Sequence, residues 1–302
     1  MTFSEYEMMG TTTGGGGHVP QIVDEMPFED YRSIRLLNNS LLSQMAISPA
    51  HFKLARDYPT ERNSAALRFG TLAHCGVLEE ESIFNRYERI PPFENKIKAK
   101  NPRATKAYKE QLAAFRETIA PKTAVAIDDF DRMLAVARAI GKYAPVFNGG
   151  TAESVFIWQD PDTGLWCKSR PDYLSFCGGL GTIYDFKTTR DCRDFGRSIA
   201  NYGYDRQAAF YLRGCKALGV DASEFWFVIA ETEPPYTVMA APIDEATLAD
   251  GEWQVQRLLR RVVECERAND WPAADSPRTF AKPAWAMHKQ DVPRLTAGGK
   301  PL

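Results

Sequence analysis

The sequence predicts a mixed α/β domain in which a helical N-terminal part packs on a central sheet. Apolar residues recur at helical spacing through residue 143, whereas short runs rich in β-branched and aromatic residues begin after Gly149-Gly150. With 302 residues, the chain is long enough to bury a core without disulfides. We therefore expect one domain over residues 26–275, between a flexible lead-in (1–25) and a loose, proline-rich tail (276–302).

The helical part is predicted from caps and apolar spacing. Asn39-Ser40 is a plausible N-cap for a helix that runs to Ile47. Ser48-Pro49 then opens a second short helix, because proline is favoured in the first turn. Further helices are expected from Gly70-Thr71 onward and over residues 105–118 and 125–143.

The second half of the domain alternates strands with helices. Residues 154–158, 165–176 and 182–186 are expected to form a three-stranded meander, because turn-forming residues separate them. The remaining elements are helices over 192–202 and 205–218, strands over 225–229 and 236–239, and a closing helix over 245–266.

Composition excludes several classes of protein. Hydrophobic residues make up 44% and charged residues 25% of the chain, which is ordinary for a globular protein. The longest uncharged run, Leu36 to Phe52, is too short and too polar to span a membrane. The N-terminus lacks the pattern of a signal peptide, and the six cysteines contain no CxxC pair. We expect reduced thiols, no membrane association and a cytoplasmic location.

The charge is unevenly distributed although its net value is only -2. Phe93 to Lys122 holds eight basic residues against three acidic ones, whereas Ala217 to Gln256 holds eight acidic residues and no basic one. Such asymmetry favours a positive face that could bind a polyanion. A solvated basic helix explains the same stretch equally well.

Two aspartates are expected to face each other across a hairpin. The turn is rich in glycine, and a centre between Gly178 and Gly179 places Asp172 opposite Asp185. Directly opposed residues have Cβ atoms about 5 Å apart. Lys187, two residues beyond Asp185, points to the same face as Asp185.

This hairpin suits metal-assisted chemistry. Two close carboxylates repel each other unless a cation or a proton neutralises them, and oxygen ligands at this separation suit Mg²⁺ or Mn²⁺. A neighbouring ammonium could orient a water for attack on phosphorus. The competing interpretation is a surface hairpin whose acids pair with Arg170 and Lys187.

The order of the motifs provides a further clue. Pro171-Asp172, Asp185-Phe186-Lys187 and a later Gln207…Tyr211 helix resemble the PD-(D/E)xK nuclease superfamily in its RecB-like branch. Phe69 to His74 resembles the glycine-to-histidine motif of that family, and Asn39 to Phe52 resembles the opening of RecE-type (exonuclease VIII-like) phage recombination nucleases. The resemblance covers about residues 28–270 and implies a restriction-endonuclease-like core, a mixed central sheet flanked by helices.

The resemblance also implies roles for individual residues. Asp172, Asp185 and the carbonyl of Phe186 would hold the metal together with His74, Lys187 would position the attacking water, and Glu153 is a weaker candidate for a further acid. Expected DNA contacts are Gln207, Tyr211, Arg170, Ser40, Lys98, Lys100 and Lys106. Plain N-capping would also explain Ser40, and packing in the core would also explain Tyr211.

The implied activity is a Mg²⁺-dependent exodeoxyribonuclease that trims duplex DNA ends 5′ to 3′ and exposes 3′ single strands for recombination, with Mn²⁺ able to substitute. The cysteine spacing does not match the iron–sulfur set of some RecB-like nucleases, so no cluster is expected. Implied partners are duplex DNA ends, further copies of the chain in a ring-like oligomer, and a RecT-like single-strand annealing protein. The alternatives are a RecB-like repair or CRISPR-associated nuclease, and a non-catalytic DNA-binding module on the same fold.

Overall fold

The computed structural model describes residues 18–60, 64–93, 101–141, 149–176 and 181–273, together with residues 282, 296–297 and 300–301. Its helices are α1 (Phe28–Ser33), α2 (Asn39–Ile47), α3 (Pro49–Asp57), α4 (Ala65–Leu78), α5 (Ile83–Arg86), α6 (Lys106–Ile119), α7 (Ile127–Gly141), α8 (Phe195–Tyr202), α9 (Tyr204–Ala217) and α10 (Glu245–Ala268). Short pairings join β2 (Tyr87–Arg89) to β3 (Thr123–Val125) and β11 (Thr296–Ala297) to β12 (Lys300–Pro301). None of the described helices is long and apolar enough to cross a bilayer.

The strands form two main sheets. The larger sheet has the order β10 (Val238–Pro242), β9 (Ala222–Glu231), β8 (Gly181–Thr189), β7 (Tyr173–Ser175) and β4 (Gly150–Ala152). Its β8 and β9 run parallel, and its other neighbours are antiparallel. The smaller, antiparallel sheet has the order β1 (Gln21–Val23), β5 (Val155–Gln159) and β6 (Trp166–Ser169). The class predicted from the sequence, a mixed sheet flanked by helices, is confirmed.

The meander expected over residues 154–186 is wrong in its connectivity. Residues 165–176 form two strands in different sheets, because Arg170-Pro171 interrupts them and proline offers no N–H to a ladder. The lead-in also differs from expectation, since residues 21–23 pair with β5. Residues 1–17 and most of the tail lie outside the described residues.

Two helix starts differ from the sequence expectation. The side chain of Asn38, rather than Asn39 or Ser40, caps α2 by accepting the N–H of Leu41. Helix α4 begins at Ala65 because Ser64 caps it, and Gly70 therefore lies inside the helix. The cap predicted at Ser48, with Pro49 in the first turn of α3, is present.

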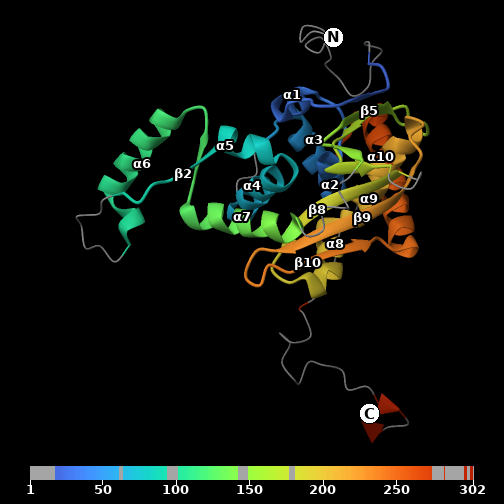
Figure 1. The fold of residues 1–302 in the computed structure, drawn as a ribbon. Coiled ribbons are helices and arrows are strands. Elements are labelled where there is room, and N and C mark those ends of the chain that lie inside the picture. Colours follow the sequence, from blue (N-terminus) through green and yellow to red (C-terminus); the bar gives the residue numbers. More distant parts are fainter. Residues whose placement is uncertain are drawn as a thin grey trace.

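The larger sheet is covered on both faces. Strand residues point alternately to either face, so Phe227 and Ile229 of β9 enter a core with α2, α9 and α10, whereas Val228 and Ala230 enter a core with α4 and α7. Figure 1 shows these helix groups on opposite sides of β8 and β9. β8 is therefore buried between them.

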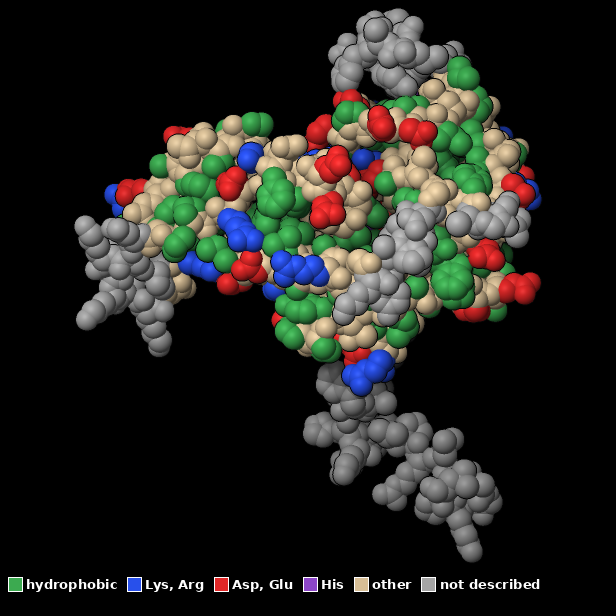
Figure 2. Space-filling model, in the orientation of Figure 1, with side chains coloured by type: hydrophobic (Ala, Val, Ile, Leu, Met, Phe, Trp, Pro, Cys, Tyr) green, Lys and Arg blue, Asp and Glu red, His purple; other side chains and the backbone are tan. Residues whose placement is uncertain are grey.

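Helix α6 extends away from this body. It packs against β3 and a short 3-10 turn (Pro102–Ala104), and none of its described residues is buried. Figure 1 shows it reached through β2, and Figure 2 shows Lys and Arg side chains on the α6 and α7 side of the face in view. The described part of the predicted basic stretch therefore includes α6, a helix that projects from the body of the protein (Figure 1).

The packing of α9 against β5 predicts a strong response at Gly214. A Cβ there would lie 2.9 Å from the ring of Trp158, which is fully buried and cannot move aside. We expect Gly214→Ala to lower the free energy of unfolding by about 1–3 kcal/mol in a denaturant titration. Gly70→Ala is the matched control, because a Cβ at Gly70 meets nothing within 4 Å and alanine favours helix interiors. A destabilised control would contradict this account.

Candidate active site

The predicted hairpin register is present in the structure. Strand β7 pairs Tyr173 with Tyr184 and Ser175 with Thr182, so the same register carried one step further sets Asp172 opposite Asp185. The backbone N–H of Phe186 donates to Asp172 Oδ2 at 2.7 Å. This bond fixes one oxygen of Asp172 beside β8. The turn itself, residues 177–180, lies outside the described residues.

Asp185 is fully buried and held by two partners. Gln207 Nε2 donates to Asp185 Oδ1 at 3.0 Å, and Lys187 Nζ forms an ion pair with Asp185 Oδ2. Gln207 Nε2 also lies 3.1 Å from the hydroxyl of Tyr211, which packs near Phe225 in the core. The Gln207–Tyr211 pair therefore supports the second acid, and Tyr211 is also part of the packing.

Three side chains converge on one point. A nitrogen of His74 and carboxylate oxygens of Glu153 and Asp172 all lie within 4.8 Å of one another. His74 Nδ1 lies 3.6 Å from Asp172 Oδ2, as the predicted contact between α4 and the hairpin requires. Asp185 does not belong to this set, although it was expected to complete it.

The alternation of β8 directs Asp185 toward α9, where Gln207 binds it. Asp185 has the strand parity of Ile183, which lies in the α9 and α10 core, whereas Phe186 points to the α4 side. The His74 ring contacts Phe186 at 5.0 Å between centroids. The His74 ring thus packs on Phe186 while Gln207 of α9 holds Asp185, and Glu153 is the third member of the set with His74 and Asp172.

Glu153 is better placed than its sequence signal suggested. It sits between β4 and β5 with φ 58°, a left-handed conformation that is rare outside glycine. Its N–H donates to the carbonyl of Asp172 at 3.1 Å. The one signal available in the sequence was an acidic residue directly ahead of a buried strand.

Arg170 holds Glu153. Its Nη2 lies 2.7 Å from Glu153 Oε2, and its Nε donates to the Glu153 carbonyl at 3.1 Å. The guanidinium also lies over the ring of Phe28. The Arg170 side chain is only 10% exposed, and its ion pair with Glu153 occupies the guanidinium that was expected to contact DNA. Its positive charge is instead used to fix a buried carboxylate.

Burial shifts Glu153, Asp172, Asp185 and His74 toward their neutral forms. Burial raises the pKa of Glu153 to about 7, although the nearby Arg170 acts to lower it. Burial also raises the pKa of Asp185 to about 6, although Lys187 acts to lower it, and it raises the pKa of Asp172. Burial and the nearby Lys187 lower the pKa of His74 to about 4. Burial also lowers the pKa of Lys187, but Asp185 and Asp172 outweigh it and the net shift is upward.

These groups fit a hard divalent cation. Ligands about 2.1 Å from one octahedral ion lie about 3.0–4.2 Å apart, close to the separations among His74, Glu153 and Asp172. One nitrogen and several carboxylate oxygens suit Mg²⁺ or Mn²⁺. His74 in its neutral form offers a nitrogen lone pair to a metal ion. The raised pKa values of Glu153 and Asp185 indicate that the protein's own cations do not fully balance these carboxylates, and a metal ion would supply the missing positive charge.

The remaining predicted DNA contacts lie elsewhere. Ser40 is exposed in the first turn of α2. Lys106 opens α6 with its side chain 91% exposed, 3.7 Å from Glu110. Lys98 and Lys100 lie outside the described residues. Of these three lysines, the described Lys106 thus lies on α6, a helix that contributes no residue to the cluster of acids.

This combination of fold and acids defines a PDDEXK-like domain, and two comparisons agree. The family model of the PDDEXK-like domain of unknown function DUF3799 matches residues 38–276, so the chain belongs to that family. No protein with a curated description matches the chain. A solved "putative exonuclease" from Eubacterium rectale is 14% identical over 86% of this chain and 96% of its own, with a TM-score of 0.50, which supports the shared fold. A second solved protein, SSO0001, is 16% identical over 72% of this chain and 84% of its own, with a TM-score of 0.27, too low to support an argument.

The raised carboxyl pKa values predict proton-linked metal binding. Glu153 is largely protonated at pH 6 and ionised at pH 8, and a metal requires the carboxylate, so affinity should increase with pH. We expect Mn²⁺ to bind about tenfold more tightly at pH 8 than at pH 6, measured by electron paramagnetic resonance without DNA. Glu153→Gln should weaken binding and flatten this dependence. An affinity that does not change with pH would contradict the assignment.

Proposed function

We propose that the protein is a metal-dependent DNA nuclease that hydrolyses phosphodiester bonds at duplex ends. The observation that carries the proposal is the convergence of His74, Glu153 and Asp172 beside the buried Asp185–Lys187 pair, within a PDDEXK-like domain. A binding module would gain nothing from burying three carboxylates and one ammonium together, since each loses hydration energy. The Eubacterium rectale neighbour is named a "putative exonuclease", and this name supports a nuclease activity.

The residues have separable tasks in this proposal. His74, Glu153 and Asp172 would hold Mg²⁺, with Mn²⁺ as a substitute, and the bound cation would stabilise charge on the phosphate and lower the pKa of water. Lys187 Nζ orients the attacking water while Asp185 keeps the ammonium in place and charged. Arg170 fixes Glu153, and Gln207 fixes Asp185.

The finer features of the proposal rest on the RecE-type resemblance. They are 5′ to 3′ degradation that leaves 3′ single strands for recombination, assembly of several copies of the chain, cooperation with a RecT-like annealing protein, and action in the cytoplasm. Ser40, Lys98, Lys100, Lys106, Gln207 and Tyr211 are the proposed contacts with the DNA backbone.

Digestion of two DNA forms tests the proposed activity. Linear duplex labelled at either the 5′ or the 3′ end should be degraded in Mg²⁺ and left intact in EDTA, while closed circular duplex should survive in both. Asp172→Ala should abolish degradation, whereas Asp128→Ala, an exposed aspartate on α7, should not. Cleavage of the closed circle would indicate an endonuclease, and no cleavage of either form would favour the binding module.

Lys187→Ala should abolish cleavage while leaving duplex affinity nearly intact. Lys187 Nζ pairs with Asp185 and is assigned to the attacking water rather than to the DNA. Its loss should therefore lower kcat by about 10²–10⁴-fold, the usual contribution of a positioned proton-transfer group. Single-turnover cleavage and fluorescence anisotropy separate the two effects, and a thermal melt controls for folding. Lys53→Ala on α3, where the lysine also pairs with an aspartate but its side chain is 42% exposed, is the matched control. Equal losses of cleavage and affinity would instead make Lys187 a phosphate contact.

The basic stretch should contribute sequence-independent affinity. Replacing Lys98, Lys100 and Lys106 together by glutamate should weaken binding to every duplex alike. Each lost phosphate contact should reduce the slope of log K against log salt by about 0.9. Anisotropy at several salt concentrations measures that slope. An unchanged slope would place the contacts elsewhere; of the alternatives Arg170, Arg190 and Arg206, Arg190 is the exposed one.

A further inference from the structure

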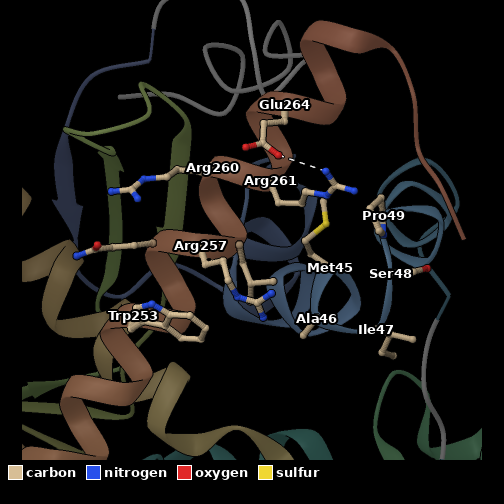
Figure 3. Close-up of a pocket in the computed structure, with 12 residues that line it drawn as sticks. Met45, Ala46, Ile47, Ser48, Pro49, Trp253, Arg257, Arg260, Arg261 and Glu264 are labelled. Carbon is tan, nitrogen blue, oxygen red and sulfur yellow. Dashed lines mark hydrogen bonds and ion pairs between the residues drawn. The ribbon is translucent and has the colours of Figure 1, made fainter. Parts of the chain in front are cut away.

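A second concave site lies between the end of α2, the start of α3 and the middle of α10. It has a volume of about 400 Å³, within the range of small-molecule sites, and none of its lining residues belongs to the candidate active site. Figure 3 shows Arg257 and Arg261 extending from α10 toward Met45, with Trp253 one turn before Arg257. Arg260 leaves α10 in a different direction.

The pocket is basic. Three arginines and one acid, Glu264, line it, a net charge of +2. Arg261 and Glu264 lie 3.3 Å apart with side chains 38% and 63% exposed. An exposed pair of this kind contributes little stability, so a phosphate could displace Glu264 at low cost. The pocket therefore favours an anion.

The pocket also holds an exposed indole. Trp253 is 59% exposed, and the guanidinium of Arg257 lies 5.1 Å from the centre of its ring. An exposed tryptophan beside arginines is the arrangement on which nucleobases stack while their phosphates are neutralised. This feature distinguishes a nucleotide from a simple anion.

The nearby start of α3 does not supply the anion contacts. The N–H of His51 is taken by Ser48 Oγ at 3.3 Å, and the N–H of Ala50 by the carbonyl of Pro272 at 3.2 Å. Binding of a phosphate would thus depend on the arginine side chains of α10.

The seam between α2 and α10 connects this pocket to the candidate active site. Arg206 donates to Ser43 of α2 at 3.0 Å and to Gln254 of α10 at 3.3 Å. Its neighbour Gln207 contacts Asp185. Ser43 and Gln254 each lie close in sequence to residues that line the pocket, so Arg206 and Gln207 of α9 link the helices of the pocket to Asp185.

We propose that the pocket binds a nucleotide of single-stranded DNA, with the base on Trp253 and the phosphates on Arg257 and Arg261. The inference rests on the proposed function, because the strand left by degradation of a duplex end is the single strand available there. The pocket would hold that strand away from the acids that cut its complement.

Binding of two 12-nucleotide probes tests this proposal. Anisotropy of labelled oligo-dT and of an abasic strand with the same phosphates is measured in EDTA, so that no cleavage is needed and failure of the nuclease proposal remains a separate result. Trp253→Ala should weaken oligo-dT binding by at least about fivefold and leave abasic binding unchanged. Arg257→Glu with Arg261→Glu should weaken both probes and reduce the salt slope by about 1.4, near 0.7 for each lost contact on a single strand.

Controls locate the contact. Arg193→Glu with Arg197→Glu carries the same charge change on arginines whose side chains are 87% and 80% exposed, and should bind both probes almost as tightly as the unmodified chain. A 5-iodouracil probe should cross-link to the peptide that holds Trp253. Unchanged binding in both pocket variants, equal losses in the control variant, or a cross-link elsewhere would overturn the proposal. Competition by polyglutamate as strong as that by oligo-dT would point to an acidic protein instead and would also overturn it.

Discussion

The burial of Asp185 is the constraint on which the rest of the site depends. A carboxylate in the middle of β8 has no access to water, so its charge must be balanced within the protein. Lys187 supplies the balancing charge from the same strand, and Gln207 supplies a hydrogen bond from α9. Arg206, the residue before Gln207, hydrogen-bonds to both α2 and α10. Satisfying one acid thereby links the central strand to the N-terminal helices and to the last long helix.

The second organising feature is the division of the strands into two sheets. The chain crosses from the larger to the smaller sheet at Glu153 and returns at Arg170-Pro171-Asp172. A hydrogen bond from the N–H of Glu153 to the carbonyl of Asp172 joins the two crossings. The ion pair between Arg170 and Glu153 joins them a second time. Two of the three converging ligands therefore come from the place where the sheets separate, and His74 reaches the same place from α4.

The sequence was sufficient for the features that local chemistry determines. The hairpin register follows from the centre of a glycine-rich turn, and the start of α3 follows from Ser48-Pro49, whose serine accepts a backbone N–H. The approach of His74 could be predicted only through a resemblance, because it joins residues about a hundred positions apart. Features that depend on the division into two sheets were harder to predict: Glu153 was only a weak candidate for the metal site, and the use of Arg170 to hold it was missed.

The backbone at Glu153 places stability and chemistry in opposition. Its left-handed φ of 58° is a conformation that glycine adopts at no steric cost and that glutamate adopts only with strain. A change from glutamate to glycine requires a single base substitution in either glutamate codon. Selection for a more stable fold alone would thus favour the residue that removes a ligand. In the proposed metal site, that one change would relieve the strained backbone and remove a carboxylate ligand at the same time.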